Sequence, residues 1–154
     1  MTRILMVCLG NICRSPLAHG ILESKLPSDK FYVDSAGTAN YHVGDLPDHR
    51  SVAVAKSHGI DISHQRGRQF KISDFDAFDY IFTMDDSNYQ NVIALARTAS
   101  DIAKVKSILE VDDTIKATYV PDPYHGEMSD FQNVFRLLEK ACQTLSEKLQ
   151  NTDL

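Results

Sequence analysis

The sequence predicts an α/β fold, in which a four-stranded parallel sheet is covered by helices on both faces. Short apolar runs alternate along the chain with amphipathic stretches, the pattern of strands that are each followed by a helix. The first run, residues 3–7, is apolar without alternation, which is typical of a strand buried on both faces. Ligands in such folds bind beyond the carboxyl ends of the strands, so the turn after this run is the first place to look for a site.

The first half of the chain predicts two strands and two helices. A helix is expected from Ser15, because Pro16 in its first turn lacks only an N–H group that would have no partner there. The buried stripe of this helix is expected to consist of Ala18, Ile21, Leu22 and Leu26. Residues 31–33 predict the second strand, and a second helix follows residues 44–50 and ends at Gly59.

The second half predicts the remaining two strands and two further helices. Residues 78–82 predict the third strand, and Asp85 or Asp86 is expected to cap the helix that follows. Residues 104–109 predict the fourth strand. A last helix is expected from about Ser129. Its apolar face consists of Phe131, Val134, Phe135, Leu138, Cys142, Leu145 and Leu149.

Length and charge restrict the class of protein. A chain of 154 residues is expected to form a single domain, residues 1–154, with a substantial core. The formal net charge of −5 argues against a nucleic-acid-binding protein, which needs basic surface to replace counterions. The apolar run at residues 4–7 is far too short for a signal core or a membrane span, so no membrane association is expected.

The cysteines and histidines indicate neither a disulfide scaffold nor a metal site. The three cysteines, an odd number, are Cys8, Cys13 and Cys142, and a chain of this length with so few is expected in the reducing cytoplasm. The six histidines do not fall at zinc spacing with the cysteines, so we expect no metal and no other cofactor. Cys142 belongs to the expected core face of the last helix.

The turn after the first strand predicts a phosphate-binding loop. It reads Cys8-Leu9-Gly10-Asn11-Ile12-Cys13-Arg14-Ser15-Pro16. Successive backbone N–H groups in a tight loop form an anion cradle, and the helix N-terminus that follows adds the positive end of its dipole. Gly10 lets the backbone approach a ligand closely, and Asn11 tolerates a left-handed conformation. Arg14 offers a planar guanidinium that grips two phosphoryl oxygens.

Cys8 begins this loop and is the candidate nucleophile. The same dipoles and Arg14 favour a thiolate over a thiol, and the thiolate is the reactive form in covalent catalysis. Ser15 can donate its hydroxyl to the sulfur and ease its later departure. The alternative is that Cys8 is a small buried side chain at a strand end, but the complete string, between a buried strand and a helix, favours phosphate chemistry.

Asp122 is the candidate general acid. A phenolate leaving group has a pKa of about 10, so its departure at neutral pH needs a proton donor. Pro121 and Pro123 stiffen the backbone around Asp122 and keep it out of the helical region, which holds the carboxyl group at a fixed distance from the leaving oxygen. Alone, Pro-Asp-Pro is more typical of a turn with a capping aspartate; with Cys8 and Arg14 present, the acid is the better interpretation.

On these residues the sequence resembles the low-molecular-weight protein tyrosine phosphatases over nearly the whole chain. The segments that carry the resemblance are residues 7–16, Ser35-Ala36-Gly37-Thr38, His42-Val43-Gly44 followed by Pro47-Asp48 and Arg50, Met84-Asp85, and Asp122-Pro123-Tyr124. The resemblance implies a four-stranded parallel sheet, hydrolysis of tyrosine-phosphorylated proteins with release of inorganic phosphate, and no cofactor. It also implies that Cys8 is the nucleophile, that Arg14 binds phosphate and that Asp122 is the acid.

The resemblance assigns supporting roles as well. A hydrogen-bonded cluster holds the loop in this family. The residues at the matching places are Asn11, Ser15, Ser35 and His64. Cys13 matches a second cysteine that many relatives carry, and the resemblance implies a disulfide with Cys8 under oxidation; a thiol that only packs in the loop is the equal alternative.

The slot for the phenyl ring is assigned by resemblance to Tyr41 and Tyr124, whose rings can sandwich an aromatic group. The family often has a second aromatic residue after Tyr124, where this chain has His125. His125 either changes the substrate preference or is simply exposed to solvent. Relatives that act on arginine phosphate tend to have threonine at the place of Ile12, so Ile12 favours tyrosine phosphate.

Three alternative functions are an arginine-phosphate phosphatase, an arsenate reductase of the same fold and a non-catalytic phosphoprotein-binding module. By resemblance, arsenate reductases relay electrons through two further cysteines after the third strand, and no cysteine lies between Cys13 and Cys142. A binding module would keep Arg14 but would need neither Cys8 nor Asp122. The tyrosine phosphatase is therefore the function that the sequence favours.

Overall fold

The structure is a computed structural model that describes residues 1–151. Its strands are β1 (Thr2–Cys8), β2 (Phe31–Gly37), β3 (Tyr80–Thr83) and β4 (Val105–Ser107). Its α-helices are α1 (Arg14–Lys25), α2 (His49–Ser57), α3 (Asp74–Ala77), α4 (Asp86–Ile93), α5 (Ala99–Ala103) and α6 (Met128–Gln150). A short 3₁₀ helix, η1 (Ile108–Val111), follows β4.

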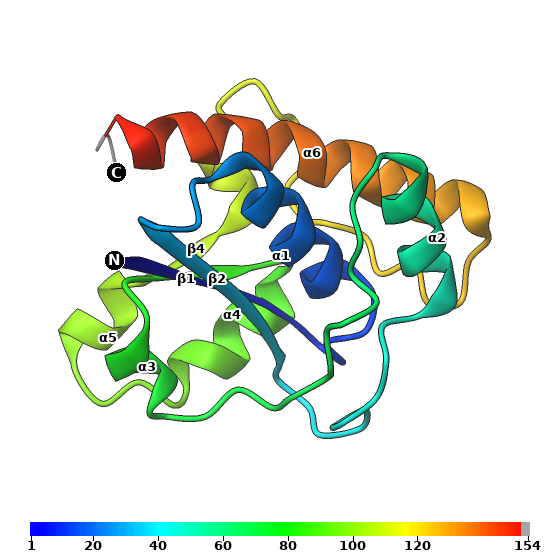
Figure 1. Cartoon of the computed structure of the whole chain (residues 1–154). Coiled ribbons are helices and arrows are strands. Elements are labelled where there is room, and N and C mark those ends of the chain that lie inside the picture. Colours follow the sequence, from blue (N-terminus) through cyan, green and yellow to red (C-terminus); the bar gives the residue numbers. More distant parts are fainter. Residues whose placement is uncertain (152–154) are drawn as a thin grey trace.

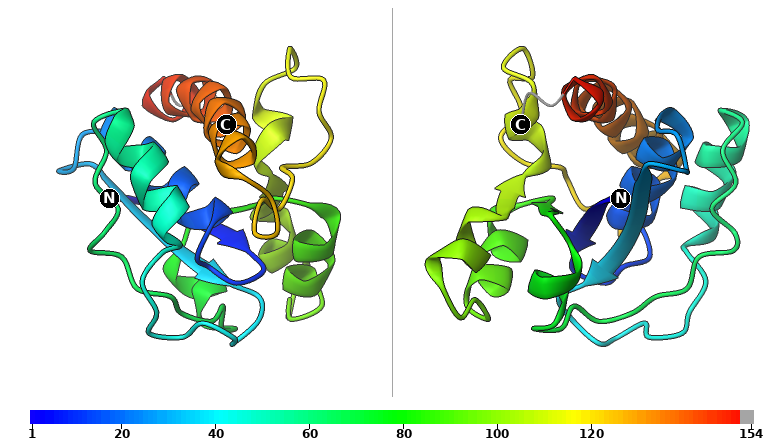
Figure 2. Two further views of the ribbon diagram at one scale, coloured as in Figure 1. Left: turned by 90° about the vertical axis from the view of Figure 1, so that its right-hand side faces the viewer. Right: turned by 60° about the vertical axis from the view of Figure 1, so that its left-hand side comes forward.

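The strands form one parallel sheet with the order β2-β1-β3-β4. Helices α1, α2 and α6 cover one face of this sheet, and α3 and α4 lie against the other (Figures 1 and 2). The predicted fold class, a four-stranded parallel sheet with helices on both faces, is confirmed. The sheet thus separates two hydrophobic cores.

Strand β1 contributes to both cores, as its unbroken apolar run predicted. Ile4 and Met6 belong to the core that includes α1 and α6, whereas Leu5 and Val7 belong to the core that includes α3 and α4. All four side chains are fully buried, because successive side chains of a strand point to opposite faces and both faces are covered. Pairing with β2 and β3 on its two sides fixes Cys8 at the carboxyl end of this strand.

The strand order places a topological switch point between β1 and β3. The chain leaves β1 toward β2 on one side of the sheet and leaves β3 toward β4 on the other. The loops after these two strands therefore diverge, which creates the crevice in which α/β sheets bind ligands. Cys8 ends β1, and Met84 and Asp85 follow β3, so residues distant in sequence meet at this crevice.

Helix α6 lies across the helices and sheet of one face (Figure 1). Its buried residues are Phe131, Val134, Phe135, Leu138, Ala141, Cys142, Leu145, Ser146 and Leu149. They include every residue of the predicted apolar face, so that prediction is confirmed. Burial raises the pKa of the Cys142 thiol to about 12, which makes Cys142 a core side chain. Among the helices of residues 1–151, none has both the length and the apolar composition needed to cross a membrane.

Several predicted boundaries are corrected by the structure. Strand β3 begins at Tyr80 rather than at Phe78, because Phe78 is the C-cap of α3, where its N–H donates to the Asp74 carbonyl oxygen, and its ring belongs to the second core. Strand β4 spans three residues, and residues 108–111 continue as 3₁₀ helix. The sequence does not predict α3 and α5, because helices of four and five residues are too short to show a helical period.

Asp112 ties the segment after η1 to α6. Its carboxylate accepts hydrogen bonds from the Thr114 N–H at 2.9 Å and from the Thr114 hydroxyl at 2.6 Å. The hydroxyl of Thr144 on α6 donates to the other oxygen at 2.6 Å. The hydrogen bonds from Thr114 and Thr144 lower the pKa of Asp112 from 3.8 to about 2.

We expect Asp112→Asn to flatten the loss of stability in acid. Because the pKa of Asp112 is lower in the folded than in the unfolded chain, its carboxylate stabilises the fold above pH 3.8, and this contribution is lost as the pH falls to about 2. Urea denaturation at a series of pH values measures the free energy of unfolding across this window. Asp113→Asn is the matched control, because the Asp113 side chain makes no hydrogen bond within residues 1–151. If the free energy of unfolding fell equally steeply with pH in wild type and in Asp112→Asn, this role of Asp112 would be contradicted.

Candidate active site

The loop between β1 and α1 wraps around the sulfur of Cys8. The Asn11 N–H donates to Cys8 Sγ at 3.3 Å, and Ser15 Oγ lies 3.0 Å from the same sulfur. Asn11 Nδ2 donates to Ser15 Oγ at 2.8 Å, so the hydroxyl can accept from Asn11 and donate to the sulfur. Asn11 has a φ of 57°, the left-handed conformation that the sequence predicted. Donors directed at a sulfur stabilise a negative charge on it.

Several N–H groups of this loop have no partner among the residues that the structure describes. Within residues 1–151, the backbone N–H groups of Leu9, Gly10, Ile12 and Cys13 donate no hydrogen bond. Helix α1 begins at Arg14 without a side-chain cap, so the first N–H groups of the helix are also unsatisfied. Buried N–H groups need a partner, and an anion at a helix N-terminus supplies one. The loop is therefore built to hold an oxyanion such as phosphate.

Arg14 is buried beside this loop, and groups from two other segments fix its guanidinium. Arg14 Nη1 donates to Asp85 Oδ2 at 2.7 Å and to the carbonyl oxygen of Val120 at 2.9 Å. Arg14 Nη2 lies 3.8 Å from Asp122 Oδ2. The Arg14 side chain is only 3% exposed, and such a charge would be costly to bury without partners. Its partners therefore hold the guanidinium in one orientation at the edge of the loop.

Asp85 has two contacts, of which the sequence predicts one. Asp85 Oδ1 accepts from the Asn88 N–H at 2.8 Å and caps α4, as predicted. Asp85 Oδ2 accepts from Arg14, and this contact was not predicted. It depends on the strand order, which brings the residues after β3 next to the loop after β1. The Met84-Asp85 segment of the resemblance was the only signal in the sequence.

Strand β2 approaches the outer side of the loop at Gly37. The Thr38 N–H donates to the Cys8 carbonyl oxygen at 2.9 Å. A Cβ atom at Gly37 would lie 2.7 Å from the carbonyl oxygen of Leu9 and 3.1 Å from the nitrogen of Asn11. Both are backbone atoms, so they could move away only if the loop moved. Gly37 is therefore required for the close packing of β2 against the loop.

Asp122 lies at the rim of the loop, in the segment between η1 and α6. Asp122 Oδ1 accepts from the Tyr124 N–H at 3.2 Å, and Oδ2 faces Arg14. The Asp122 side chain is 45% exposed, so it meets both the loop and solvent. The structure thus brings together Cys8, Arg14 and Asp122, the three predicted catalytic residues.

Arg50 of α2 holds the Asp122 segment in place. Its guanidinium donates to the carbonyl oxygens of Tyr124 and Gly126 at 2.8 and 3.0 Å, and to both carboxylate oxygens of Asp48 through Nε at 3.0 Å and Nη2 at 2.9 Å. Burial raises the pKa of Asp48, but the hydrogen bonds from Arg50 outweigh burial, and the pKa of this carboxyl is lowered. The Asp48 N–H donates to the Ile12 carbonyl oxygen at 2.8 Å. This ion pair therefore links the Asp122 segment to the phosphate loop.

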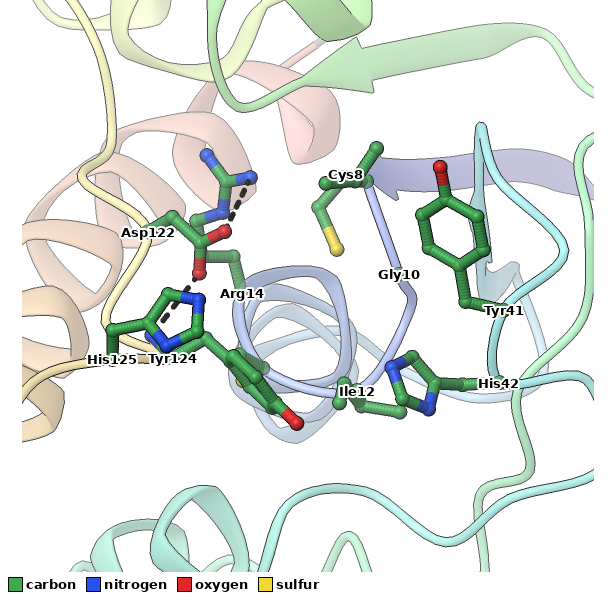
Figure 3. Close-up of a pocket in the computed structure, with 11 residues that line it drawn as sticks. Cys8, Gly10, Ile12, Arg14, Tyr41, His42, Asp122, Tyr124 and His125 are labelled. Carbon is green, nitrogen blue, oxygen red and sulfur yellow. Dashed lines mark hydrogen bonds and ion pairs between the residues drawn. The ribbon is translucent and has the colours of Figure 1, made fainter.

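These segments enclose a pocket of about 220 Å³ (Figure 3). Its lining residues are Cys8, Leu9, Gly10, Ile12, Cys13, Arg14, Tyr41, His42, Asp122, Tyr124 and His125. Figure 3 shows the Cys8 sulfur between Asp122 on one side and Tyr41 on the other. The predicted catalytic residues and the predicted slot residues Tyr41, Tyr124 and His125 thus line one cavity.

The rim of this pocket is aromatic. Tyr41 is 72% exposed and Tyr124 41% exposed, so both rings are accessible from solvent. The Tyr124 ring meets His125 edge-on, with centroids 4.9 Å apart, and its centroid lies 6.3 Å from that of His42. His42 Nδ1 lies 3.1 Å from Asp45 Oδ2. The sequence did not single out His42 as a slot residue, although it lies next to Tyr41 and belongs to the His42-Val43-Gly44 segment of the resemblance.

The prediction that His64 supports the loop is wrong. His64 is exposed and hydrogen-bonds to no residue of the loop. Its neighbours Ile62 and Gln65 are the buried residues of this segment, and Gln65 Nε2 donates to the Pro16 carbonyl oxygen at 3.2 Å. With those two side chains turned inward, His64 lies on the outer side of the chain.

Other residues take the place predicted for His64. Ser35 is buried, as expected for a supporting residue, but its hydroxyl lies 3.2 Å from Nδ1 of His19 on α1. His19 Nε2 lies 3.4 Å from Glu23 Oε2, and the hydrogen bond from His19 lowers the pKa of Glu23. Asn11 Oδ1 accepts from the Arg68 N–H at 3.0 Å. The sequence did not single out His19, because a histidine on a helix carries no motif of its own.

Cys13 is a second thiol beside the nucleophile. Burial raises the pKa of Cys13, and the negative charges of Asp48, Cys8 and Asp122 raise it further. Cys13 is therefore protonated at neutral pH, which leaves Cys8 as the nucleophile of the two. All three cysteines are free thiols. In the part of the chain that the structure describes, no group of three or more His, Cys, Asp or Glu side chains could hold a metal ion.

Comparisons with known proteins agree with this geometry. A family model described as low molecular weight phosphotyrosine protein phosphatase matches residues 3–153. The chain belongs to this family. The human low molecular weight phosphotyrosine protein phosphatase is 38% identical over 152 residues, 94% of each chain, and that of Saccharomyces cerevisiae is 39% identical over 142 residues, 86% of each chain. A crystal structure of the protein tyrosine phosphatase from Entamoeba histolytica matches with a TM-score of 0.95 and 39% identity over 100% of both chains.

Membership of this family confirms the predicted activity. The protein is a hydrolase that acts on phosphotyrosine in proteins. Cys8 and Arg14 occupy the loop after β1, where a phosphate-binding site of this fold is expected. Phosphoproteins are therefore its class of substrate, and inorganic phosphate is its product.

We expect Asp85→Asn to lower kcat/KM about 10-fold on a small aryl phosphate such as p-nitrophenyl phosphate. The amide can still cap α4, but it replaces a charge-assisted hydrogen bond to Arg14, a kind that contributes about 1.5–3 kcal/mol, and about 1.4 kcal/mol corresponds to 10-fold in rate. Steady-state kinetics measures this. Asp86→Asn is the matched control, because Asp86 is the next residue and does not contact Arg14. An unchanged or raised kcat/KM in Asp85→Asn would show that Asp85 does not position Arg14.

Gly37→Ala should lower both stability and kcat, because the added methyl group displaces the backbone of the phosphate loop. Overpacking of this kind costs about 1–3 kcal/mol in the free energy of unfolding. Gly59→Ala separates the two effects: Gly59 has a φ of 77°, and a Cβ there meets no atom within 4 Å. The Gly59→Ala substitution should lower the free energy of unfolding, because alanine rarely adopts a positive φ, and it should leave kcat unchanged. Urea denaturation and steady-state kinetics on both variants provide the test. Full activity in Gly37→Ala would show that glycine is not required at this position for β2 to pack against the loop.

Proposed function

We propose that Cys8, Arg14 and Asp122 hydrolyse tyrosine phosphate in two steps, through a phosphocysteine intermediate. The observation that carries this proposal is that these three side chains line one pocket. The pocket holds a sulfur with two donors beside it, a guanidinium in a fixed orientation and a carboxyl group at the rim. A nucleophile, an oxyanion site and a proton donor are the three parts that this reaction requires.

In the first step, the Cys8 thiolate attacks phosphorus in line with the phenolic oxygen. The S–P bond forms as the P–O bond to tyrosine breaks. The unpaired N–H groups of the loop and the Arg14 guanidinium bind the three equatorial oxygens, where charge develops in the transition state. Because Asp85 and the Val120 carbonyl already hold Arg14, little reorientation is needed when phosphate enters.

Asp122 supplies the proton for the leaving oxygen. Its carboxyl group faces Arg14, with Oδ2 3.8 Å from Nη2. A phosphate dianion bound to Arg14 places negative charge next to this carboxyl group, and a like charge favours the protonated form of an acid. Binding of the substrate thus prepares Asp122 to protonate the phenolate as it departs.

In the second step, Asp122 acts as a base. It takes a proton from a water molecule, whose oxygen attacks phosphorus as the S–P bond breaks. The sulfur leaves as a thiolate, which the Ser15 hydroxyl and the Asn11 N–H stabilise. Inorganic phosphate is released, and Asp122 is protonated again for the next cycle.

The aromatic rim supports an aryl ester as the substrate. Tyr41 and Tyr124 offer ring faces for a phenyl group, and Ile12 adds an apolar side chain to the lining of the pocket. Vibrio vulnificus Wzb, which is 27% identical with a TM-score of 0.85 over 96% of this chain and 98% of that one, has been solved in complex with benzylphosphonate. That ligand joins a phosphonate to an aromatic ring, the same two groups that tyrosine phosphate presents. These features favour tyrosine phosphate over arginine phosphate.

The chemistry also restricts the cellular setting. Cys8 must remain reduced to act, and all three cysteines are free thiols. A reducing compartment keeps thiols in that state, so we place this phosphatase in the cytoplasm, with tyrosine-phosphorylated proteins as partners and no nucleic acid. The proposed steps use side chains and backbone groups of the chain together with one water molecule.

We expect Cys8→Ser to abolish turnover of a tyrosine-phosphorylated peptide, because the serine hydroxyl is a far weaker nucleophile. Asp122→Asn should lower kcat about 10²–10⁴-fold on this substrate, the usual contribution of a positioned acid. The loss should be smaller on p-nitrophenyl phosphate, because nitrophenolate departs more readily without a proton. Phosphate release, measured with a chelator present, tests all three expectations.

Each other outcome of this experiment assigns a different function. Equal losses in Asp122→Asn on both substrates would show that Asp122 is not the acid. Tight binding of the peptide without turnover by reduced wild type would indicate a phosphoprotein-binding module. Turnover confined to arginine phosphate would keep the mechanism and replace the substrate.

A further inference from the structure

A second groove adjoins the catalytic pocket and shares Leu9 and Tyr41 with it. It has a volume of about 500 Å³. Its lining residues are Leu9, Thr38, Ala39, Asn40, Tyr41, Gln69, Asn91 and Leu95. The groove thus lies over the carboxyl ends of β1 and β2 and reaches to the end of α4.

The lining of this groove carries no charged side chain, although 24% of the residues of the chain are charged. Leu9 and Leu95 are 38% and 41% exposed, so the groove presents two aliphatic side chains to solvent beside the ring of Tyr41. The catalytic pocket, in contrast, contains Arg14 and Asp122. The two adjoining cavities therefore suit different parts of one ligand. The catalytic pocket suits a charged part, and the groove suits an uncharged part.

Amide groups are placed among these apolar side chains. The side chains of Asn40 and Asn91 make no hydrogen bond within residues 1–151, and Gln69 Nε2 donates to the Thr38 carbonyl oxygen at 3.3 Å. The Thr38 hydroxyl is buried and has no partner within the same residues. Side-chain amides both donate and accept hydrogen bonds, as the backbone of an extended peptide does. The groove therefore offers partners for peptide groups as well as for an aliphatic side chain.

The groove lies where a substrate chain would leave the pocket. Leu9 follows the nucleophile Cys8 directly, and Figure 3 shows Tyr41 on the opposite side of the loop from Asp122 and Tyr124. An extended peptide advances by about 3.3–3.6 Å per residue, so one or two residues carry it past the Tyr41 ring. A chain with its phosphotyrosine in the pocket thus reaches the groove with its nearest neighbours.

We propose that this groove binds the uncharged segment of the substrate protein next to the phosphotyrosine. One aliphatic side chain of the substrate packs between Leu9 and Leu95, and the amides of Asn40 and Asn91 bind its backbone. An acidic side chain at the same position would lose hydration beside Leu9 and Leu95, and no opposite charge in the lining would compensate for that loss. The inference rests on the proposed function and deepens it, because it makes an aliphatic neighbour a determinant of substrate choice.

The test compares phosphotyrosine peptides that carry Leu or Asp at one of the two positions on either side of the phosphotyrosine. Each kcat/KM is divided by that of free phosphotyrosine, which does not extend into the groove. Wild type should prefer Leu to Asp about 10-fold at one of these positions, a usual discrimination for an apolar pocket. Leu95→Asp should remove this preference. Ile102→Asp should keep it, because Ile102 is similarly exposed, at 45%, but lies on α5 outside both cavities.

The possible failures are distinguishable. Wild type that hydrolyses neither the peptides nor free phosphotyrosine would overturn the proposed function and this inference with it. Hydrolysis with equal kcat/KM for the Leu and Asp peptides, or with a preference that Leu95→Asp preserves, would overturn this inference alone. A change in sedimentation of Leu95→Asp with an unaltered preference would assign the groove to a second copy of the chain, which also overturns it.

Discussion

The contact between Arg14 and Asp85 is the interaction on which the site depends. Arg14 follows β1 and Asp85 follows β3, and their 2.7 Å contact closes the crevice at the switch point of the sheet. A buried ion pair is a weak source of stability, because desolvation of the charges offsets their attraction. Its value here is geometric. It fixes a guanidinium at the mouth of a loop in which the N–H groups of Leu9, Gly10, Ile12 and Cys13 donate to no group of residues 1–151. Phosphate can then bind to groups that are already in position.

The parts of the site that are contiguous in sequence were predictable. A buried strand, a Gly-Asn turn and the first turn of a helix occupy residues 3–16, so local rules predict the loop, the left-handed Asn11 and the roles of Cys8 and Arg14. The layers of the fold follow from the same kind of reasoning, because the apolar run of β1 and the apolar face of α6 are visible as patterns. Asp122 lies far along the chain, and only its flanking prolines and the resemblance made it a candidate.

The contacts between segments were not predictable in the same way. The pairing of Asp85 with Arg14 requires the strand order, and the clamp of Arg50 on the Asp122 segment requires the position of α2. His64 shows the opposite error: a residue at a matching place in a motif was assigned a contact, but the burial of Ile62 and Gln65 turns it outward. Side-chain direction in an irregular segment depends on packing across the whole fold, and no local pattern encodes it.

The covalent intermediate on Cys8 is tested most directly by partition of the phosphoryl group between water and an added alcohol such as glycerol. The measurement is made on several aryl phosphates whose phenols differ in acidity. A common phosphocysteine predicts one ratio of inorganic phosphate to glycerol phosphate for all of them, because each substrate yields the same intermediate before water or alcohol attacks. A ratio that changes with the leaving group would show that water attacks the substrate directly, and would contradict nucleophilic catalysis by Cys8.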